Sequence, residues 1–136
     1  MDSTVTEVAI VEDDTETAEM LAEMMRLSGY NVRLYHGAQI AISAFRHHPP
    51  HLVILDVMMP DVSGLEVVRY MRREPLLQTV PVIILSAKST PTAIQEGLES
   101  GANQYLTKPV TFKKLKATVE EMLAAHAHGT ASRGSS

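Results

Sequence analysis

Polar side chains follow four apolar runs in this sequence, at points where buried strands are expected to end. Asp56 ends one run, and the acidic pair Glu12 and Asp13 ends another. Ser86 and Lys108 stand at the ends of two later runs. In open parallel sheets, ligands bind outside the carboxyl ends of the strands. These residues therefore form a candidate site.

The types of these residues complement a phosphoryl group and a metal ion. Carboxylates that converge on one sheet edge repel one another, and a divalent cation removes that cost. Their hard oxygens suit Mg²⁺, which takes few protein ligands. Asp56 is the candidate nucleophile because a carboxylate can form an acyl phosphate. Lys108 and Ser86 would offer a positive charge and a hydroxyl to the phosphoryl oxygens. The pattern predicts a magnesium-dependent phosphoryl acceptor site.

Each of these residues also has a simpler interpretation. The acidic residues 12–14 would suit the start of a helix, where the dipole favours negative charge. Lys108 would be an exposed lysine before a turn proline, and Ser86 a cap or turn residue. Only Asp56 caps nothing obvious. Four suitable residue types on four strand ends of one edge favour the phosphoryl acceptor over these separate explanations.

Short apolar segments alternate with amphipathic ones along the chain, which implies βαβ units and a parallel sheet. Five units in this length imply an open doubly wound α/β sheet, not a barrel. The expected strands are residues 8–11, 31–35, 52–56, 81–85 and 104–107. The expected helices begin near residues 15, 37, 63, 91 and 111, and the last ends near residue 125.

Two helices show which side chains should face the core, because apolar residues three and four positions apart share one helix face. The first is expected to bury Ala18, Leu21, Ala22 and Met25. The second is expected to bury Ile40, Ala41, Ala44 and Phe45.

Composition limits the class of protein. The 136 residues fit one domain, expected over residues 1–125, with a flexible tail or linker start over residues 126–136. A net charge of -4 gives no general attraction to nucleic acid or anionic membrane. The absence of cysteine excludes disulfides and indicates the reducing cytoplasm. The chain starts without a signal-peptide pattern, and its apolar runs are far shorter than the ~20 residues of a membrane helix.

Four segments resemble the receiver domains of two-component response regulators, and the resemblance covers about residues 6–125. They are Ala9–Asp14 (AIVEDD), Leu55–Gly64 (LDVMMPDVSG), Val82–Ala87 (VIILSA) and Gly101–Pro109 (GANQYLTKP). The resemblance implies a flavodoxin-like, three-layer (βα)5 sandwich whose five-stranded parallel sheet has the order 2-1-3-4-5.

The same resemblance implies roles for the site residues. Asp56 would be the phosphoacceptor. Glu12, Asp13 and Asp56 would form the acidic Mg²⁺ site, with Asp13 and Asp56 as direct ligands and the Met58 backbone carbonyl as a third. Asp14 would lie outside the direct ligands.

Ser86, Tyr105 and Lys108 complete the set that the resemblance implies. Lys108 would be the cation beside the phosphoryl group, and the Lys108–Pro109 bond would be cis. Ser86 and Tyr105 would be the switch pair. Phosphorylation would move Ser86 toward the phosphoryl group and turn Tyr105 inward, which shifts a surface of the fourth helix, fifth strand and fifth helix.

The implied function is a phosphorylation-dependent signalling switch. A sensor histidine kinase or a histidine phosphotransfer protein would supply the phosphoryl group, and a downstream effector protein or domain would read the result. The domain would take part in catalysing its own phosphorylation and dephosphorylation without being an enzyme that turns over a metabolite. The surface of the fourth helix, fifth strand and fifth helix could also join two copies of the domain in a homodimer. No direct nucleic-acid contact and no membrane insertion are expected. Asn103 and Gln104 depart from DNA-binding members, many of which carry an acidic pair there.

Three alternatives remain. An aspartyl-phosphate hydrolase needs a second aspartate two residues after the nucleophile, where this chain has Met58. A receiver-like binding module that is not regulated by phosphate is disfavoured because every chemical position is filled. A flavodoxin-like cofactor carrier is disfavoured because residues 12–14 would repel a phosphate in the absence of a metal.

Overall fold

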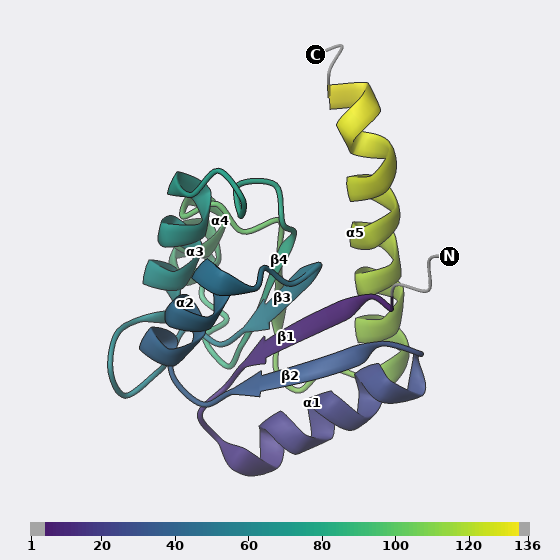
Figure 1. Cartoon of the computed structure of the whole chain (residues 1–136). Helices are drawn as coiled ribbons and strands as arrows, with labels where there is room; N and C mark the ends of the chain where they lie inside the picture. The colour runs from purple at the N-terminus through teal and green to yellow at the C-terminus, as the bar shows by residue number, and fades with distance from the viewer. Residues whose placement is uncertain (1–4, 134–136) are drawn as a thin grey trace.

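The computed structural model describes residues 5–133, with side chains described to residue 126. Its strands form one sheet in which all neighbours are parallel, in the order β2-β1-β3-β4-β5 (Figure 1). This confirms the predicted parallel sheet and its order. The strands are β1 (Glu7–Val11), β2 (Asn31–Tyr35), β3 (Leu52–Leu55), β4 (Val82–Ser86) and β5 (Gln104–Thr107).

Helices cover both faces of the sheet, which gives the predicted three layers. Helices α1 and α5 lie on one face, and α2, α3 and α4 lie on the other (Figure 1). The helices are α1 (Thr15–Leu27), α2 (Ala38–His47), α3 (Gly64–Arg73), α4 (Pro91–Glu99) and α5 (Phe112–Arg133). None of the described helices is both long and apolar enough to cross a membrane.

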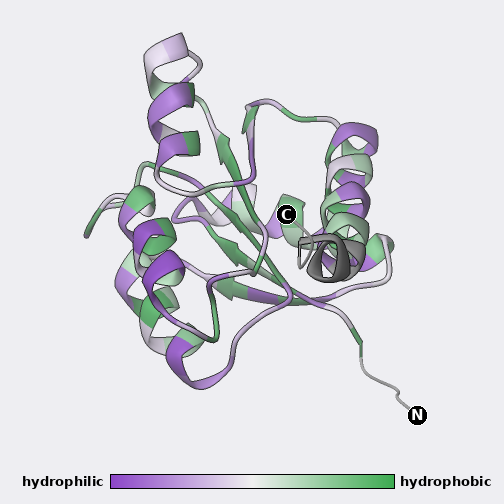
Figure 2. Cartoon of the chain, turned by 90° about the horizontal axis from the view of Figure 1, so that it is seen from above, coloured by the Kyte–Doolittle hydropathy of each residue, from purple (hydrophilic) through white to green (hydrophobic). Residues whose placement is uncertain are grey.

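The central strands divide their side chains between two apolar clusters. Successive strand residues point to opposite faces, so Val53 contributes to the cluster under α2 and α3, whereas Leu52 contributes to the cluster under α1 and α5. Strands β3 and β4 are buried along their whole length. In Figure 2 the central strands are mostly hydrophobic, whereas hydrophilic and hydrophobic residues alternate along the helices. Burial on both faces explains why these strands read as continuous apolar runs.

Helix ends follow the capping chemistry of the sequence. The Asp14 carboxylate accepts a hydrogen bond from the Thr17 amide at 2.9 Å and caps α1. Ser63 and Thr90 cap α3 and α4 in the same way. Helix α2 differs, because its N-cap is Gly37 and has no side chain to offer. The chain leaves α1 through Gly29, whose φ of 97° suits glycine.

The predicted inner face of α2 is partly wrong. Ile40 is 61% exposed, and Ala38 is buried instead, together with Ala41 and Phe45. These buried positions are spaced three and four residues apart, so they form one narrow stripe against the sheet. Ile40 lies about 100° around the helix from Ala41, outside that stripe. The inner face predicted for α1 is confirmed, because all four of its residues are buried.

Helix α5 is longer than predicted. It continues to Arg133 instead of ending near Ala125, and in Figure 1 it extends past the edge of the sheet. Residues 126–133, predicted as a tail or linker start, therefore belong to this helix, and residues 134–136 lie outside the described residues. Leu115 and Val119 anchor its first half in the core. The domain boundary at residue 125 stays a prediction.

The two faces of α2 give a direct test of the packing. Replacing the fully buried Phe45 with alanine should lower the free energy of unfolding by about 3–5 kcal/mol, since it removes a large side chain and leaves a cavity. Ile40→Ala on the same helix should change it by less than about 0.5 kcal/mol, because the side chain is exposed. Urea unfolding followed by circular dichroism measures both. A similar loss in the two variants would contradict the orientation of α2.

Candidate functional site

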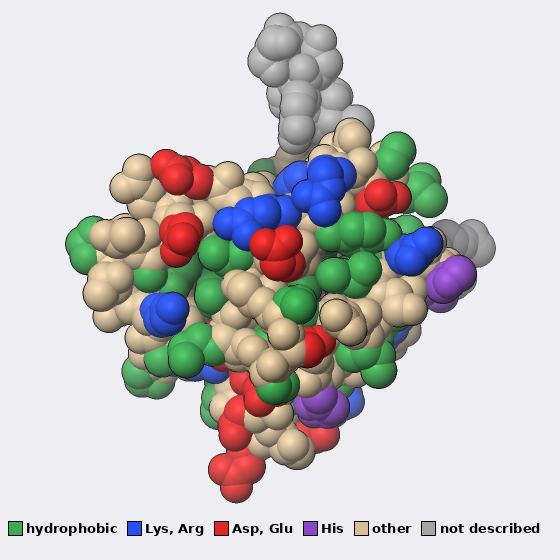
Figure 3. Space-filling model, turned by 90° about the vertical axis from the view of Figure 1, so that its left-hand side faces the viewer, with side chains coloured by type: hydrophobic (Ala, Val, Ile, Leu, Met, Phe, Trp, Pro, Cys, Tyr) green, Lys and Arg blue, Asp and Glu red, His purple; other side chains and the backbone are tan. Residues whose placement is uncertain are grey.

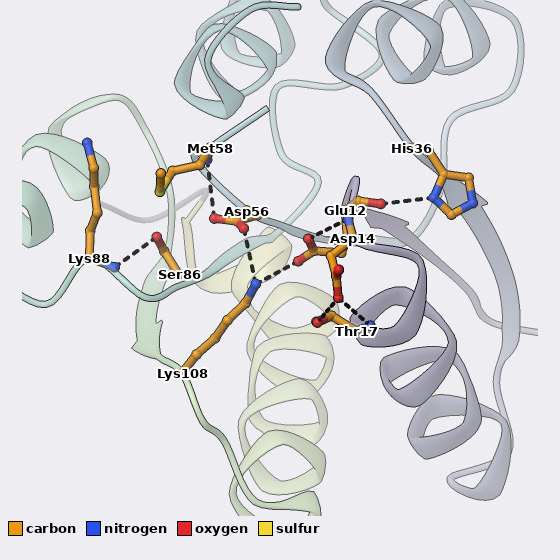
Figure 4. A network of polar contacts seen from close by, with 9 residues as sticks. All are labelled: Glu12, Asp14, Thr17, His36, Asp56, Met58, Ser86, Lys88 and Lys108. Carbon is orange, nitrogen blue, oxygen red and sulfur yellow. Dashed lines mark hydrogen bonds and ion pairs between the residues drawn. The ribbon is translucent and has the colours of Figure 1, made fainter. Parts of the chain in front are cut away.

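The carboxyl edge of the sheet brings Glu12, Asp56 and Lys108 into direct contact. The Lys108 ammonium donates to Glu12 Oε1 at 2.8 Å and to Asp56 Oδ2 at 3.1 Å (Figure 4). Both carboxylates are buried: Glu12 is 3% exposed and Asp56 is 8% exposed. One lysine therefore compensates two buried negative charges that are 44 residues apart in the chain.

This contact holds Lys108 in its charged form. Burial alone would lower the pKa of the lysine, but its hydrogen bonds and charge attraction to Glu12 and Asp56 outweigh burial and raise the pKa above its ordinary value. The ammonium therefore stays protonated around neutral pH. Strand β5 and the cis Lys108–Pro109 bond, which was predicted, precede the turn into α5 at this point.

The backbone around Asp56 is tightly packed. Strand β3 ends at Leu55, and the Asp56 amide donates to the Val11 carbonyl of β1 at 3.1 Å. A side chain at Gly64 would overlap the Asp56 carbonyl oxygen and lie 2.9 Å from Leu55 Cδ1. Only glycine lets the start of α3 approach β3 so closely, which fixes the path of the loop between them. The Gly64 amide closes that loop by donating to the Val57 carbonyl at 2.8 Å.

Met58 and Ser86 lie beside Asp56. The Met58 amide donates to Asp56 Oδ1 at 3.2 Å, so each oxygen of the Asp56 carboxylate has one donor. Ser86 ends β4, the strand next to β3, and is completely buried. Its Oγ accepts from the Lys88 amide at 3.2 Å. Figure 4 shows Ser86, Asp56 and Glu12 arranged across the edge of the sheet.

Tyr105 lies on β5, the strand next to β4, and reaches the same loop as Ser86. Its hydroxyl donates to the Lys88 carbonyl at 2.7 Å. A side chain at Gly97 of α4 would lie 2.7 Å from Tyr105 Cδ2 and 2.9 Å from Ile84 Cδ1. The tyrosine ring therefore rests on the backbone of α4, where only glycine leaves room for it.

The acidic residues after β1 take different positions. Glu12 Oε2 accepts from the Asp14 amide at 3.0 Å, while the Asp14 carboxylate caps α1. Asp14 is thus used by the helix, in line with its expected place outside the direct ligands. Asp13 is exposed, and within the described part of the chain its carboxylate has no hydrogen-bond or ion-pair partner.

The donor set fits a hard cation by type, although Lys108 is the cation that the structure places there. Every candidate ligand at this edge offers oxygen, which suits Mg²⁺. Among the described residues, no three histidine, cysteine or acidic side chains are gathered so that they could hold a metal ion. The Lys108 ammonium lies between Glu12 and Asp56, whereas the Asp13 carboxylate makes no polar contact with the residues that the structure describes. The structure thus brings together Glu12, Asp56 and Lys108, but it does not gather Asp13 with them.

Sequence reasoning missed two polar contacts, one in the loop after Asp56 and one at the opposite end of the sheet, where β4 and β5 begin. Asp61 accepts hydrogen bonds from the first amides of α2. The signal was Gly37, a helix start without a capping side chain. Arg72 donates to the carbonyl oxygens of Leu77, Gln78, Val80 and Gly101, and to Asn103 Oδ1. No sequence signal indicates this second contact, since an arginine near the end of α3 is an ordinary surface residue.

The charge balance of the site gives a second test. Lys108→Met should lower the free energy of unfolding at pH 7 by about 2 kcal/mol, because two buried carboxylates lose their cation. Added Mg²⁺ should then stabilise this variant more than the parent chain, since it supplies the missing charge. Lys88→Met removes an exposed lysine with the same charge and is the matched control. Equal losses in the two variants, measured by urea unfolding with and without Mg²⁺, would contradict this role of Lys108.

Comparison with known proteins places this site in a family. Residues 8–120 match the family described as response regulator receiver domain. The DNA-binding response regulator MtrA of Mycobacterium tuberculosis is 36% identical over 123 residues, which are 90% of this chain and 53% of the relative. The phosphate regulon transcriptional regulatory protein PhoB of Pseudomonas aeruginosa is 34% identical over 85% of this chain and 51% of its own length. The chain therefore spans about half the length of these curated relatives.

Solved structures of receiver domains have the same fold as this chain. The signal receiver domain of a signal transduction histidine kinase from Syntrophus aciditrophicus has a TM-score of 0.82 and 32% identity, over 88% of this chain and 91% of that one. A CheY-like receiver domain protein from Methanospirillum hungatei has a TM-score of 0.87 at 21% identity over 93% of this chain and 99% of that one, which shows the fold alone. The chain belongs to the response regulator receiver domain family, whose members are phosphorylation-dependent switches of two-component signalling and not classical enzymes.

Proposed function

We propose that Asp56 is the phosphoacceptor of this receiver domain and that the site works with Mg²⁺. The observation that carries the proposal is the contact of the Lys108 ammonium with both Glu12 and Asp56. Asp56 is a buried carboxylate at a strand end, where open α/β sheets bind their ligands. The ammonium beside it can pair with the negative charge of a phosphoryl group.

The transfer moves one phosphoryl group between two nucleophiles. An Asp56 oxygen attacks the phosphorus of a phosphohistidine, the P–O bond forms, and the P–N bond breaks. The imidazole leaves with the bonding electrons and can take up a proton. Dephosphorylation replaces Asp56 by water, which releases inorganic phosphate and restores the carboxylate. Both steps depend mainly on positioning and on neutralising charge.

Each neighbour of Asp56 has a proposed task in this transfer. Mg²⁺, when bound by Asp13, Asp56 and the Met58 carbonyl with Glu12 beside them, would neutralise charge on the phosphoryl oxygens. Lys108, already 3.1 Å from Asp56 Oδ2, would pair with a phosphoryl oxygen. The Ser86 hydroxyl would donate to another.

The backbone of Lys88 connects the two proposed switch residues. Its amide donates to Ser86 Oγ and its carbonyl accepts from the Tyr105 hydroxyl. If Ser86 turned toward a phosphoryl group, its bond to the Lys88 amide would be lost and the loop before α4 would be released to shift. Tyr105 would report that shift to the surface formed by α4, β5 and α5. This supports a two-state surface that phosphorylation biases.

The partners follow from this chemistry. The donor would be a histidine kinase or a histidine phosphotransfer protein, and we place the exchange in the cytoplasm because the sequence lacks cysteine. The reader would be an effector protein or domain, and a homodimer through α4, β5 and α5 is a further outcome of the switch. The MtrA relative is described as DNA-binding and is about twice as long as the matched region. We propose no direct nucleic-acid contact for this domain itself.

The acceptor is tested by mass spectrometry. Incubation with Mg²⁺ and a small acyl-phosphate donor should add one phosphoryl group to the parent chain, and omitting Mg²⁺ should abolish the addition. Asp56→Asn should prevent it. Asp14→Asn is the matched control, because asparagine also caps helices well and the α1 start is kept. An adduct that survives Asp56→Asn, or none in the parent chain, would overturn the assignment.

The switch is tested at Gly97. Gly97→Ala should push Tyr105 off α4, because the new methyl group would lie 2.7 Å from the ring. The rate of phosphorylation should change by less than about twofold, since Gly97 does not contact Asp56. Amide hydrogen exchange in the loop before α4 should instead rise in the unphosphorylated protein and respond less to phosphorylation. An unchanged exchange pattern in this variant would argue against a coupled Tyr105.

A further inference from the structure

Helix α2 takes its N-terminal cap from a distant loop. Its own N-cap residue, Gly37, has no side chain. Asp61, in the loop between β3 and α3, accepts from the Ala38 amide at 3.2 Å through Oδ1 and from the Gln39 amide at 2.9 Å through Oδ2. Both carboxylate oxygens are therefore used, and the negative charge lies where the helix dipole favours it.

The same loop carries the backbone of Met58 beside Asp56. It is fixed near its start, where the Met58 amide donates to Asp56 Oδ1 at 3.2 Å, and at its end, where the Gly64 amide donates to the Val57 carbonyl. Met59 and Val62 are partly buried against the apolar cluster under α2 and α3. The Asp61 contact adds an attachment outside the loop itself, and it joins the loop to the neighbouring helix α2.

The charge of Asp61 suits this contact. The hydrogen bond from the Gln39 amide is the largest influence and, with smaller ones from Val62 and Ala38, lowers the pKa of the Asp61 carboxyl. Asp61 is therefore ionised at neutral pH and accepts both amide hydrogens at once. The face over α2 and α3 mixes acidic, basic and apolar side chains (Figure 3). The surface charge there is therefore not of one sign, and it could not stabilise the start of α2 in place of Asp61.

We propose that Asp61 is a positioning residue for the phosphoryl acceptor site. By tying the loop to α2, it holds the Met58 peptide groups at the distance from Asp56 that metal binding and phosphoryl transfer require. It touches neither the metal nor the phosphoryl group. The inference rests on the proposed function of Asp56 and Mg²⁺, and it extends that function to a residue outside the site.

A pair of variants separates positioning from simple helix capping. Asp61→Ala removes both the cap and the tie. Adding Gly37→Ser to it gives α2 a cap of its own, because serine is a good N-cap and Gly37 has an extended φ of -168° that any residue adopts. The space is available, since a side-chain carbon at Gly37 would lie 3.5 Å from the nearest Asp61 oxygen. Gly37→Ser alone is the control for the new serine.

Three measurements are made on each chain: stability in urea, apparent Mg²⁺ affinity with the rate of adduct formation from an acyl-phosphate donor, and amide exchange of residues 57–63. Asp61→Ala should weaken Mg²⁺ binding about tenfold, the lower end of losses when a ligand's supporting contact is removed. In the double variant stability should return toward that of the parent chain, while Mg²⁺ affinity stays low and exchange in the loop stays fast.

Recovery of all three properties in the double variant would overturn the proposal and leave Asp61 as a helix cap only. An Asp61→Ala variant with unchanged Mg²⁺ affinity would overturn it as well. Failure of the proposed function gives a different result, namely no Mg²⁺-dependent adduct in the parent chain. In that case the exchange data still decide whether Asp61 holds the loop in place.

Discussion

The repulsion between Glu12 and Asp56 is the constraint on which this structure depends. Parallel strands deliver their carboxyl ends to one edge, so β1 and β3 place two carboxylates close together and out of solvent. Burying like charges is costly unless a cation joins them. The lysine that follows β5 supplies the cation, across the width of β3 and β4. The charge balance of the site therefore depends on the strand order, which brings the ends of β1, β3 and β5 to the same edge of the sheet.

The solution leaves the site ready for chemistry. A buried carboxylate held by one amide and one ammonium is oriented but not enclosed, because neither donor has to leave for a new bond to form on its other lone pairs. The loop that follows Asp56 ends at Gly64, where there is no room for a side chain, and the Gly64 amide closes it by donating to the Val57 carbonyl. A domain that is modified and restored repeatedly needs two such properties. The loop after Asp56 must be held in place, and the ion pair between Lys108 and Asp56 must be replaceable by one with a phosphoryl oxygen.

The sequence predicted the sheet, the faces of α1 and the placement of Glu12, Asp56, Ser86 and Lys108, because periodicity and strand ends are local signals. It misplaced Ile40, since the width of a buried stripe depends on how closely α2 meets the sheet, which no local pattern contains. It also missed Asp61 and Gly97. Both contact residues of other elements, up to 23 positions away in the chain. The role of Asp61 depends on the missing side chain of Gly37, and that of Gly97 on the ring of Tyr105, so neither can be recognised without the fold. The length of α5 escaped because its last turns carry residues typical of a tail.

The contacts of Arg72 give the domain a fixed end opposite its reactive one. Burial lowers the pKa of this arginine. Its guanidinium donates to carbonyl and amide oxygens, among them those of Gly101 just after α4 and Asn103 just before β5. The C-terminal end of α4 is thus held by hydrogen bonds, while its N-terminal end follows an exposed loop. A displacement of that loop would rotate α4 about its C-terminal end, where Arg72 holds the chain. A shift near Lys88 would then be expected to tilt the helix, because the Arg72 contacts oppose a slide along the sheet.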